Sequence, residues 1–374
     1  MKVERINVKE FLEALDIVSN AIPNKSAIPC LTNVNLKFED DKITLLGFDT
    51  ITSIKKVIFK DNDNFEILES GNVLVDCKML KAILSKLNCS TTDFYTNNNQ
   101  FVIENGKSIY RLNMANLEEY PKVEFKKLKN EIVFKTKELI NVIEKTIFAT
   151  ATNEMRPVLT GVNFNSNGNT LNCVATDSFR LSQYTISFET ELNNVNFVFP
   201  KQSLLAMNKI ISKTNEEYIK LLYDDNNKDI LFNVDKILYK TRLLEGNYPN
   251  TSRLIAYDTC DKICSVNKDL LINALDRVSI FNDNNSQTIK LIFNSNNQLE
   301  VKSLDNSVGN GNEVIECDKC NFDLTIACNS KNLIEALNVF EKDVIDIYLS
   351  SELRPVFIKN EENVIELILP VRID

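Results

Sequence analysis

Two aspartates in similar surroundings are the first residues whose type and spacing suggest chemistry. Asp49 precedes a threonine and Asp177 precedes a serine. Two carboxylates that share one proton can activate water, which is the chemistry of the aspartic proteases. Those enzymes have a glycine after the Asp-Thr/Ser pair, and here Ile51 and Phe179 stand in its place. Hydrolysis by paired aspartates is one hypothesis, and a turn-shaping role for each aspartate is the other.

A second group with possible chemistry consists of cysteines in the last third of the chain. Cys317 and Cys320 have the C-x-x-C spacing of metal knuckles and redox pairs, and Cys260 and Cys264 precede them. Four thiolates can hold zinc. The alternative is that the nine scattered cysteines are buried or loop thiols in a reducing compartment.

Other kinds of active site are excluded by what the sequence lacks. It contains no histidine, which rules out Ser-His-Asp and Cys-His nucleophile systems and histidine metal sites. It has eight glycines and neither a GxGxxG nor a GxxxxGK[ST] motif, so no phosphate-binding loop is visible. Paired aspartates and a cysteine site therefore remain as the candidate chemistries.

The aspartates recur at a fixed spacing along the chain. Asp49, Asp177 and Asp305 are separated by 177 − 49 = 128 and 305 − 177 = 128 residues. A Tyr-Pro pair at 120–121 returns at 248–249, again 128 residues later. Independent landmarks that agree on one period indicate a triplicated unit. An aspartate present in all three copies is more typical of a shared fold than of one active site, so we predict that Asp177 shapes a turn.

Each repeated unit is predicted to contain two helices between strands. Apolar residues at helical spacing predict helices at 7–22, 77–87, 135–150, 201–211, 266–281 and 330–340. Alternating apolar and polar residues predict strands that include 33–38, 64–69, 218–223, 228–234, 343–349 and 363–369. The predicted fold class is α+β, with three repeated domains at 1–128, 129–256 and 257–374. Each domain would pack its two helices on antiparallel sheets.

The composition is that of folded, soluble domains. The 374 residues are 44% apolar and 25% charged, and the chain is too long for one ordinary core. The first residues carry no long apolar stretch, and no later run approaches the length of a membrane span. We expect a cytoplasmic protein without a membrane partner.

Four motifs give the chain a resemblance to one family along essentially its whole length. They are RPVLTGV (156–162), ATDSFRL (175–181), EGNYPNTSRLI (245–255) and LPVRI (369–373). With the triplicated unit, they resemble the bacterial DNA polymerase III beta subunit, the sliding clamp of replication. The resemblance implies a homodimer, closed head to tail into a ring of six similar domains. Such a ring encircles duplex DNA, is opened by a clamp-loader ATPase and tethers the polymerase. It has no active site, so the resemblance also implies a protein that is not an enzyme, with no catalytic residues, no metal and no cofactor.

The resemblance also implies how the chain meets DNA. Basic residues in the hole would contact the phosphates, and phosphate contacts position a protein without reading sequence. The implied DNA-facing residues are Lys25, Lys78, Arg156 and Lys201. The net charge of −9 is no objection, because net charge does not report the sign of one face.

A groove for short peptides of other proteins is the family's second implied site. Its expected partners are the polymerase III catalytic subunit, the clamp loader, and other polymerases and repair proteins with clamp-binding peptides. The implied groove residues are Leu159, Thr176, Ser178, Phe179, Arg180, Leu181, Pro249, Arg253, Leu254, Leu367, Ile368, Leu369, Pro370, Val371 and Arg372. Proline cannot continue a central strand, so we expect the chain to leave its sheet at Pro370. That would leave Leu367, Ile368, Leu369 and Val371 partly available to a partner.

The subunit interface is the third implied site. It would pair a strand edge of the first domain, with Tyr110 and Leu112, against the third domain around Ile280 and Phe281. An exposed Phe281 after its helix would fit such an interface, and a core position for Phe281 is the alternative. Edge-to-edge pairing would cover strands that otherwise invite aggregation.

Overall fold

The computed structural model describes residues 1–374 except 62–63, 127, 154, 193, 225–227, 283–286, 305–306, 308 and 373–374. The chain divides into two compact units. Unit 1 comprises Met1–Ile140 and Gln202–Leu243, and unit 2 comprises Asn141–Lys201 and Leu244–Asp374. The second repeat therefore contributes strands to both units. None of the helices in the described segments is long and apolar enough to cross a membrane.

Unit 1 is built on two sheets. The first has the strand order β5 (Glu66–Glu69), β1 (Lys2–Asn7), β7 (Thr91–Asn97), β8 (Gln100–Asn105) and β9 (Ser108–Asn113). The second has the order β10 (Asn130–Lys135), β15 (Tyr218–Tyr223), β16 (Asp229–Val234), β17 (Ile237–Arg242), β4 (Thr52–Phe59), β3 (Lys42–Phe48), β2 (Asn33–Glu39) and β6 (Gly71–Asp76). The second sheet is continuous because β17 of the second repeat pairs with β4 of the first.

Unit 2 follows the same plan. Its longer sheet has the order β14 (Asn196–Pro200), β11 (Gly161–Asn167), β12 (Thr170–Thr176), β13 (Arg180–Ser187), β25 (Val364–Ile368), β24 (Val356–Lys359), β23 (Val344–Leu349) and β18 (Lys262–Asn267). Its shorter sheet has the order β21 (Asn312–Glu316), β20 (Gln298–Ser303), β19 (Thr288–Asn294) and β22 (Leu324–Asn329). Here β13 of the second repeat pairs with β25 of the third.

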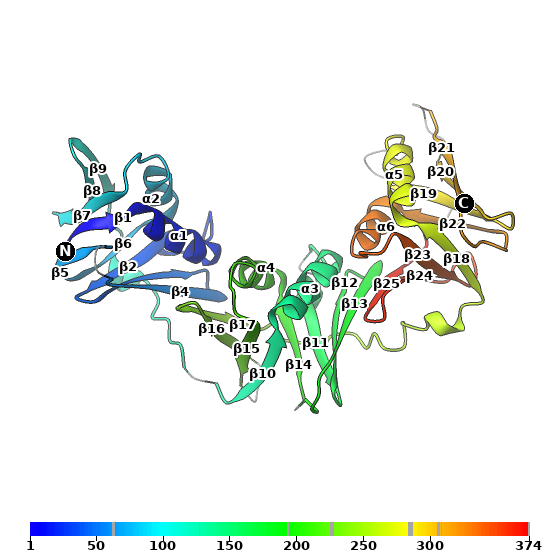
Figure 1. Cartoon of the computed structure of the whole chain (residues 1–374), viewed down its shortest axis with the longest axis horizontal. Coiled ribbons are helices and arrows are strands. Elements are labelled where there is room, and N and C mark those ends of the chain that lie inside the picture. The colour runs from blue at the N-terminus through cyan, green and yellow to red at the C-terminus, as the bar shows by residue number, and fades with distance from the viewer. Residues whose placement is uncertain are drawn as a thin grey trace. The chain divides into compact units, whose positions relative to one another are not determined.

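Six α-helices lie in the described segments, two in each repeat, as the sequence predicts. They are α1 (Val8–Val18), α2 (Cys77–Leu84), α3 (Thr136–Thr146), α4 (Lys201–Ile211), α5 (Lys268–Ser279) and α6 (Ser330–Leu337). In Figure 1, α1 and α2 pack side by side, as do α5 and α6. The predicted α+β class with antiparallel sheets is confirmed, and each expected strand has a counterpart.

Asparagine and aspartate caps explain where several helices begin. The side chains of Asn7, Asp76, Asn267 and Asn329 each accept a hydrogen bond from a backbone N–H in the first turn of the helix that follows. Such caps satisfy donors that would otherwise lack partners at a helix N-terminus. The apolar faces behind these caps are buried, which fixes each helix against its sheets.

Candidate functional site

The turn between β12 and β13 is organised by Asp177. Its Oδ1 accepts hydrogen bonds from the backbone N–H of Phe179 at 2.9 Å and of Arg180 at 3.0 Å. Ser178 has φ of 79°, a left-handed backbone conformation that is strained for a residue other than glycine. The aspartate compensates by holding the two following amides, and the prediction that Asp177 shapes a turn is confirmed.

The first repeat builds the same turn. Asp49 Oδ1 accepts from the backbone N–H of Ile51 at 2.9 Å and of Thr52 at 2.6 Å, and Thr50 has φ of 82°. Both carboxylates are thus engaged by their own turns, which favours the structural role over paired hydrolysis. The third copy, Asp305, lies outside the described residues.

Thr176 and Arg180 complete the turn. The Thr176 hydroxyl donates to the Arg180 carbonyl at 2.5 Å and accepts from the Ser178 N–H at 3.1 Å. The turn places Phe179 at its tip, where the phenyl side chain is 67% exposed. An exposed aromatic side chain of this kind is typical of a surface that binds another molecule.

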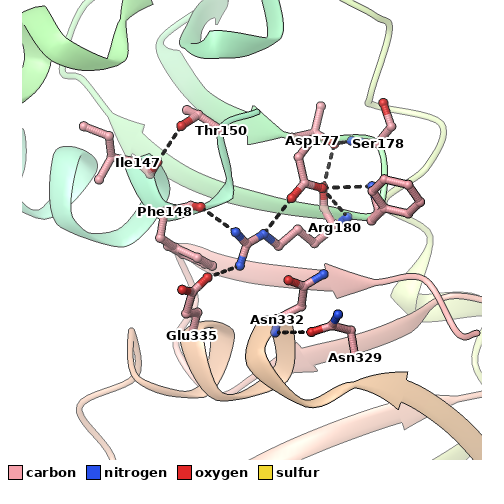
Figure 2. Close-up of polar contacts among 11 residues, drawn as sticks. Ile147, Phe148, Thr150, Asp177, Ser178, Arg180, Asn329, Asn332 and Glu335 are labelled. Carbon is pink, nitrogen blue, oxygen red and sulfur yellow. Dashed lines mark hydrogen bonds and ion pairs between the residues drawn. The ribbon is translucent and has the colours of Figure 1, made fainter. Parts of the chain in front are cut away.

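The Arg180 guanidinium joins three segments of unit 2 (Figure 2). Its Nε donates to Asp177 Oδ2 at 3.0 Å, and another nitrogen donates to the Phe148 carbonyl at 2.8 Å. A third donates to the Glu335 carboxylate on α6. The Phe148 ring lies 5.1 Å from the guanidinium carbon, at cation–π distance. These contacts connect the β12–β13 turn to α6 of the third repeat. The Arg180 guanidinium therefore stabilises the turn and is not free to bind a ligand with these donors.

A buried apolar cluster lies next to this turn. It contains Val174, Leu181, Phe357, Ile365 and Leu367, and Tyr248, Ile255 and Tyr257 pack against it. The cluster is held together by the β13–β25 ladder, in which Leu181 is opposite Leu367 and Arg180 is opposite Ile368. Strands from two repeats therefore form one continuous core beneath the turn.

The expected exposure of the C-terminal segment is partly wrong. Leu367 and Ile368 are buried, because β25 runs to Ile368 inside the ladder and Pro370 lies beyond the strand's end. Leu369 and Val371 are 39% and 38% exposed, as expected. The segment is tied down by its backbone, since the Leu369 N–H donates to Phe179 O at 2.9 Å and the Val371 N–H to Ala327 O at 2.7 Å.

Four of the predicted groove residues are exposed apolar side chains, and we call them the apolar rim: Phe179, Leu254, Leu369 and Val371. Phe179 and Leu369 are joined by their backbone hydrogen bond. Leu254 precedes Ile255, which packs on the buried cluster. The backbone N–H of each rim residue is hydrogen-bonded, so these exposed apolar side chains stand on a tied backbone.

A cavity of about 390 Å³ lies in unit 2 and contains two predicted groove residues, Leu159 and Pro249. Its lining also includes Arg156, for which the family resemblance implies a position facing DNA. The remaining lining residues are Pro157, Val158, Glu245, Gly246 and Asn247. Sequence reasoning missed them as site residues, although RPVLTGV and EGNYPNTSRLI, the motifs that contain them, were the available signal.

The other predicted groove residues lie around these features. Ser178 and Arg253 are exposed, Pro370 is half-buried, and Arg372 is exposed near the end of the chain. None of these four takes part in the buried cluster.

The predicted interface strand of the first domain lies at a sheet edge, and a sheet of unit 2 also has an open edge, at a strand that the sequence did not single out. In the described part of unit 1, β9 is the last strand of its sheet, with Tyr110 exposed and Leu112 buried. In unit 2, β21 is the last strand of its sheet, and Val314 on it is exposed. These are open backbone edges that another strand can join.

The side chain of Phe281 lies between the two alternatives, an exposed position and a core position. Phe281 is half-buried because its ring packs against the chain at Gly311, where an added Cβ would lie 2.8 Å from the ring. The neighbouring Ile280, at the end of α5, is instead 78% exposed.

Comparison with known proteins gives three matches to models of one family. The DNA polymerase III beta subunit matches through its N-terminal domain at residues 1–124, its central domain at 133–250 and its C-terminal domain at 257–372. The beta sliding clamp of Streptococcus pneumoniae is 33% identical over 98% of both chains, and that of Bacillus subtilis 31% identical over 98% of both. The chain belongs to the DNA polymerase III beta subunit family.

Solved structures agree with this assignment. The crystal structure of the sliding clamp from Bacillus subtilis matches with a TM-score of 0.92 and 30% identity, covering 100% of both chains. The chain is therefore built of three clamp domains and serves in DNA replication as a sliding clamp.

The predicted DNA-facing residues of this clamp chain differ in exposure. Lys25, Lys78 and Arg156 are exposed, whereas Lys201 is half-buried at the start of α4. Burial lowers the pKa of Lys201 from its usual value. Lys78 also lines a cavity of about 330 Å³ with Lys81, at the beginning of α2.

A buried acid lies under the junction of the second and third clamp domains. Glu366 on β25 is fully buried, and its Oε1 lies 2.7 Å from the Ser182 hydroxyl. Ser182 also donates to the Lys145 carbonyl at 2.5 Å. A hydroxyl has one proton to donate and a carbonyl can only accept, so both contacts are satisfied together when the Glu366 carboxyl is protonated. Burial raises the pKa of Glu366 well above its usual value, in agreement with this geometry.

Replacing Glu366 by glutamine is expected to stabilise unit 2 increasingly as the pH rises. The folded state keeps the Glu366 proton and the unfolded state loses it above a pKa of about 4.3. Wild-type stability therefore falls by about 1.4 kcal/mol per pH unit between the unfolded and folded pKa values. Glutamine carries no such penalty. Guanidinium unfolding between pH 5 and 8 measures the difference.

The matched control for this prediction is Glu362→Gln, in the loop before β25, where the side chain is exposed. We expect its stability to run parallel to that of the wild type at every pH. A Glu366→Gln difference that is the same at pH 5 and pH 8 would show that the buried carboxyl is ionised in the fold.

Proposed function

We propose that two copies of the chain close head to tail into a ring around duplex DNA, and that the apolar rim binds peptides of the proteins it tethers. The observation that best supports the ring is that this sliding clamp chain has two open sheet edges, one at β9 and one at β21. Pairing β9 of one subunit with β21 of its partner would extend the sheets across two equivalent interfaces. Ile280, exposed beside the third domain's sheet, would be covered by the same contact.

The ring needs no catalytic step and no cofactor. Its proposed clamp domains are 1–128, 129–256 and 257–374, and it would work in the cytoplasm. Enclosure retains DNA without tight adhesion, so the ring can slide. This is consistent with turn aspartates that are occupied by backbone amides instead of facing a substrate.

Contact with DNA is proposed for Lys25, Lys78, Arg156 and Lys201. Duplex DNA carries one negative charge per about 1.7 Å of its axis, and cations opposite the phosphates attract every sequence equally. A sliding clamp requires that lack of preference. An overall charge of −9 would discourage DNA from binding elsewhere on the ring.

Partner binding is proposed at the apolar rim and at the cavity that Leu159 and Pro249 line. A leucine or phenylalanine anchor contributes about 1.5–3 kcal/mol when it is buried. A micromolar site requires about 8 kcal/mol. Two or three anchors with a few hydrogen bonds therefore give an exchangeable site. The polymerase catalytic subunit, the clamp loader, and other polymerases and repair proteins would take turns at it.

The test of the ring is retention on DNA of different topology. Loaded by a clamp loader onto nicked circular plasmid, the chain is expected to stay bound through gel filtration in high salt. Cutting the plasmid once should release it, and blocking both cut ends with bound protein should restore retention. Equal loss from circular and cut DNA would refute enclosure.

A further inference from the structure

Three cysteine thiols converge in the C-terminal clamp domain. The sulfurs of Cys264, on β18, and Cys317, directly after β21, are 3.6 Å apart. The thiol of Cys320 interacts with Cys264 as well. Cys260, the fourth member of the possible metal knuckle, packs instead against the buried apolar cluster. Among the described residues, no group of three or more His, Cys, Asp or Glu side chains is arranged to hold a metal.

The backbone holds these thiols together from two sides. The Ser265 N–H donates to Lys319 O at 2.8 Å and the Asp318 N–H to Ser265 O at 2.9 Å, which fixes the segment 317–320 against β18. On the other side, Asn297 O accepts from the Cys317 N–H at 2.8 Å and Asn297 Oδ1 from the Cys320 N–H at 2.7 Å. The sulfur contact is therefore built into the fold.

The members of the pair are not equivalent. Cys317 retains 8% exposure, whereas Cys264 and Cys320 are fully buried. The Cys264 S–H donates to Cys317, which holds the pKa of Cys317 below its usual value, and the same bond with burial raises the pKa of Cys264. Thiolates react with oxidants and thiols do not, so Cys317 is the sulfur prepared to react first.

We propose that Cys317 and Cys264 are a redox pair that forms a reversible disulfide when a hydroperoxide reaches Cys317. The sulfurs need to approach by roughly 1.5 Å, from their contact distance to a bond of about 2.05 Å. This proposal does not depend on the ring.

The chemistry takes two steps. The Cys317 thiolate attacks the terminal oxygen of the hydroperoxide, the O–O bond breaks, and an alcohol leaves after taking up a proton. Cys317 is then a sulfenic acid. The Cys264 sulfur attacks the Cys317 sulfur, the S–O bond breaks, and the hydroxyl leaves as water with the Cys264 proton. Two thiols are oxidised, and the hydroperoxide is reduced to alcohol and water.

The Cys264–Cys317 pair lies next to the edge strand that we propose for the subunit interface. Cys317 follows β21, the edge strand, and Cys264 lies on a different sheet. A disulfide would lock the end of the edge strand to β18. Slower dissociation of the oxidised dimer is the expected result, and this consequence alone rests on the proposed ring. A monomeric chain that still forms the disulfide would refute the ring and leave the redox pair standing.

The test treats the full chain with hydrogen peroxide, alkylates the remaining thiols, and maps disulfides by peptide mass spectrometry without reduction. We expect a linked Cys264–Cys317 peptide pair that disappears after dithiothreitol. The Cys264→Ala variant should instead accumulate a Cys317 sulfenic acid that dimedone traps. The matched control is Cys328→Ala. Cys328 is buried in the same unit, burial raises its pKa to about 12, and its loss should leave the link unchanged.

Three results would overturn the proposal. The first is alkylation of both Cys264 and Cys317 after a treatment that oxidises the half-buried Cys89 and Cys260. The second is a predominant Cys317–Cys320 link, which would remove Cys264 as the resolving thiol. The third is stoichiometric zinc in the freshly purified chain that is lost from Cys317→Ala.

Discussion

Replacing Ile280 by lysine is expected to raise the dissociation constant of the dimer about 10²- to 10⁴-fold. Burial of an isoleucine contributes about 1.5–3 kcal/mol, and a ring of two equivalent interfaces loses that amount twice. Each factor of ten in affinity corresponds to about 1.4 kcal/mol. Desolvation of the new charge would add to the effect. Sedimentation velocity over a dilution series measures it.

The Ile280→Lys substitution is not expected to destabilise the fold of the subunit. Ile280 is 78% exposed and follows the last turn of α5. A cation is favourable at a helix C-terminus, so lysine is preferred here to aspartate. The control is Leu353→Lys, at a side chain that is 59% exposed in the same unit. If the wild-type chain is monomeric at micromolar concentration, the ring proposal is refuted. If the Ile280→Lys dimer dissociates like the wild type, Ile280 does not lie in the interface.

Deletion of residues 370–374 is expected to weaken the binding of partner peptides by about tenfold to a hundredfold. The dimer should remain intact. The deletion removes Val371 from the apolar rim, which costs about 1.5–3 kcal/mol of apolar contact. It also removes the Val371 N–H bond to Ala327 O, which ties the end of the chain down. Fluorescence anisotropy with a labelled clamp-binding peptide of the polymerase measures the affinity.

A single substitution separates the rim from the chain end. Phe179→Ala removes the most exposed member of the rim, and the Asp177 hydrogen bonds that hold its backbone do not involve the phenyl group. We expect it to weaken the same peptide without affecting the dimer. Leu353→Ala should bind the peptide like the wild type. If the deletion variant and Phe179→Ala bind the peptide as tightly as Leu353→Ala and the wild type do, the apolar rim is not the peptide-binding site.

The repeat and its local elements were predictable from the sequence. Helical periodicity and capping residues are local, and the helices therefore lie close to their predicted ranges. The role of Asp177 was predictable for the same reason, because an Asx turn is made by residues two and three positions apart. The family resemblance rested on short motifs, and it identified the sliding clamp.

Contacts between distant segments were decided by the tertiary structure. Arg180 meets Glu335 and Cys264 meets Cys317 across 155 and 53 residues, respectively. The burial of Leu367 and Ile368 depends on the register of β25 beside β13. A strand's hydrophobic pattern says that one face is buried but does not say which strand lies next to it. The packing of the whole unit determines which strands are neighbours. It therefore also determines the positions of the apolar rim, the buried Glu366 and the Cys264–Cys317 pair.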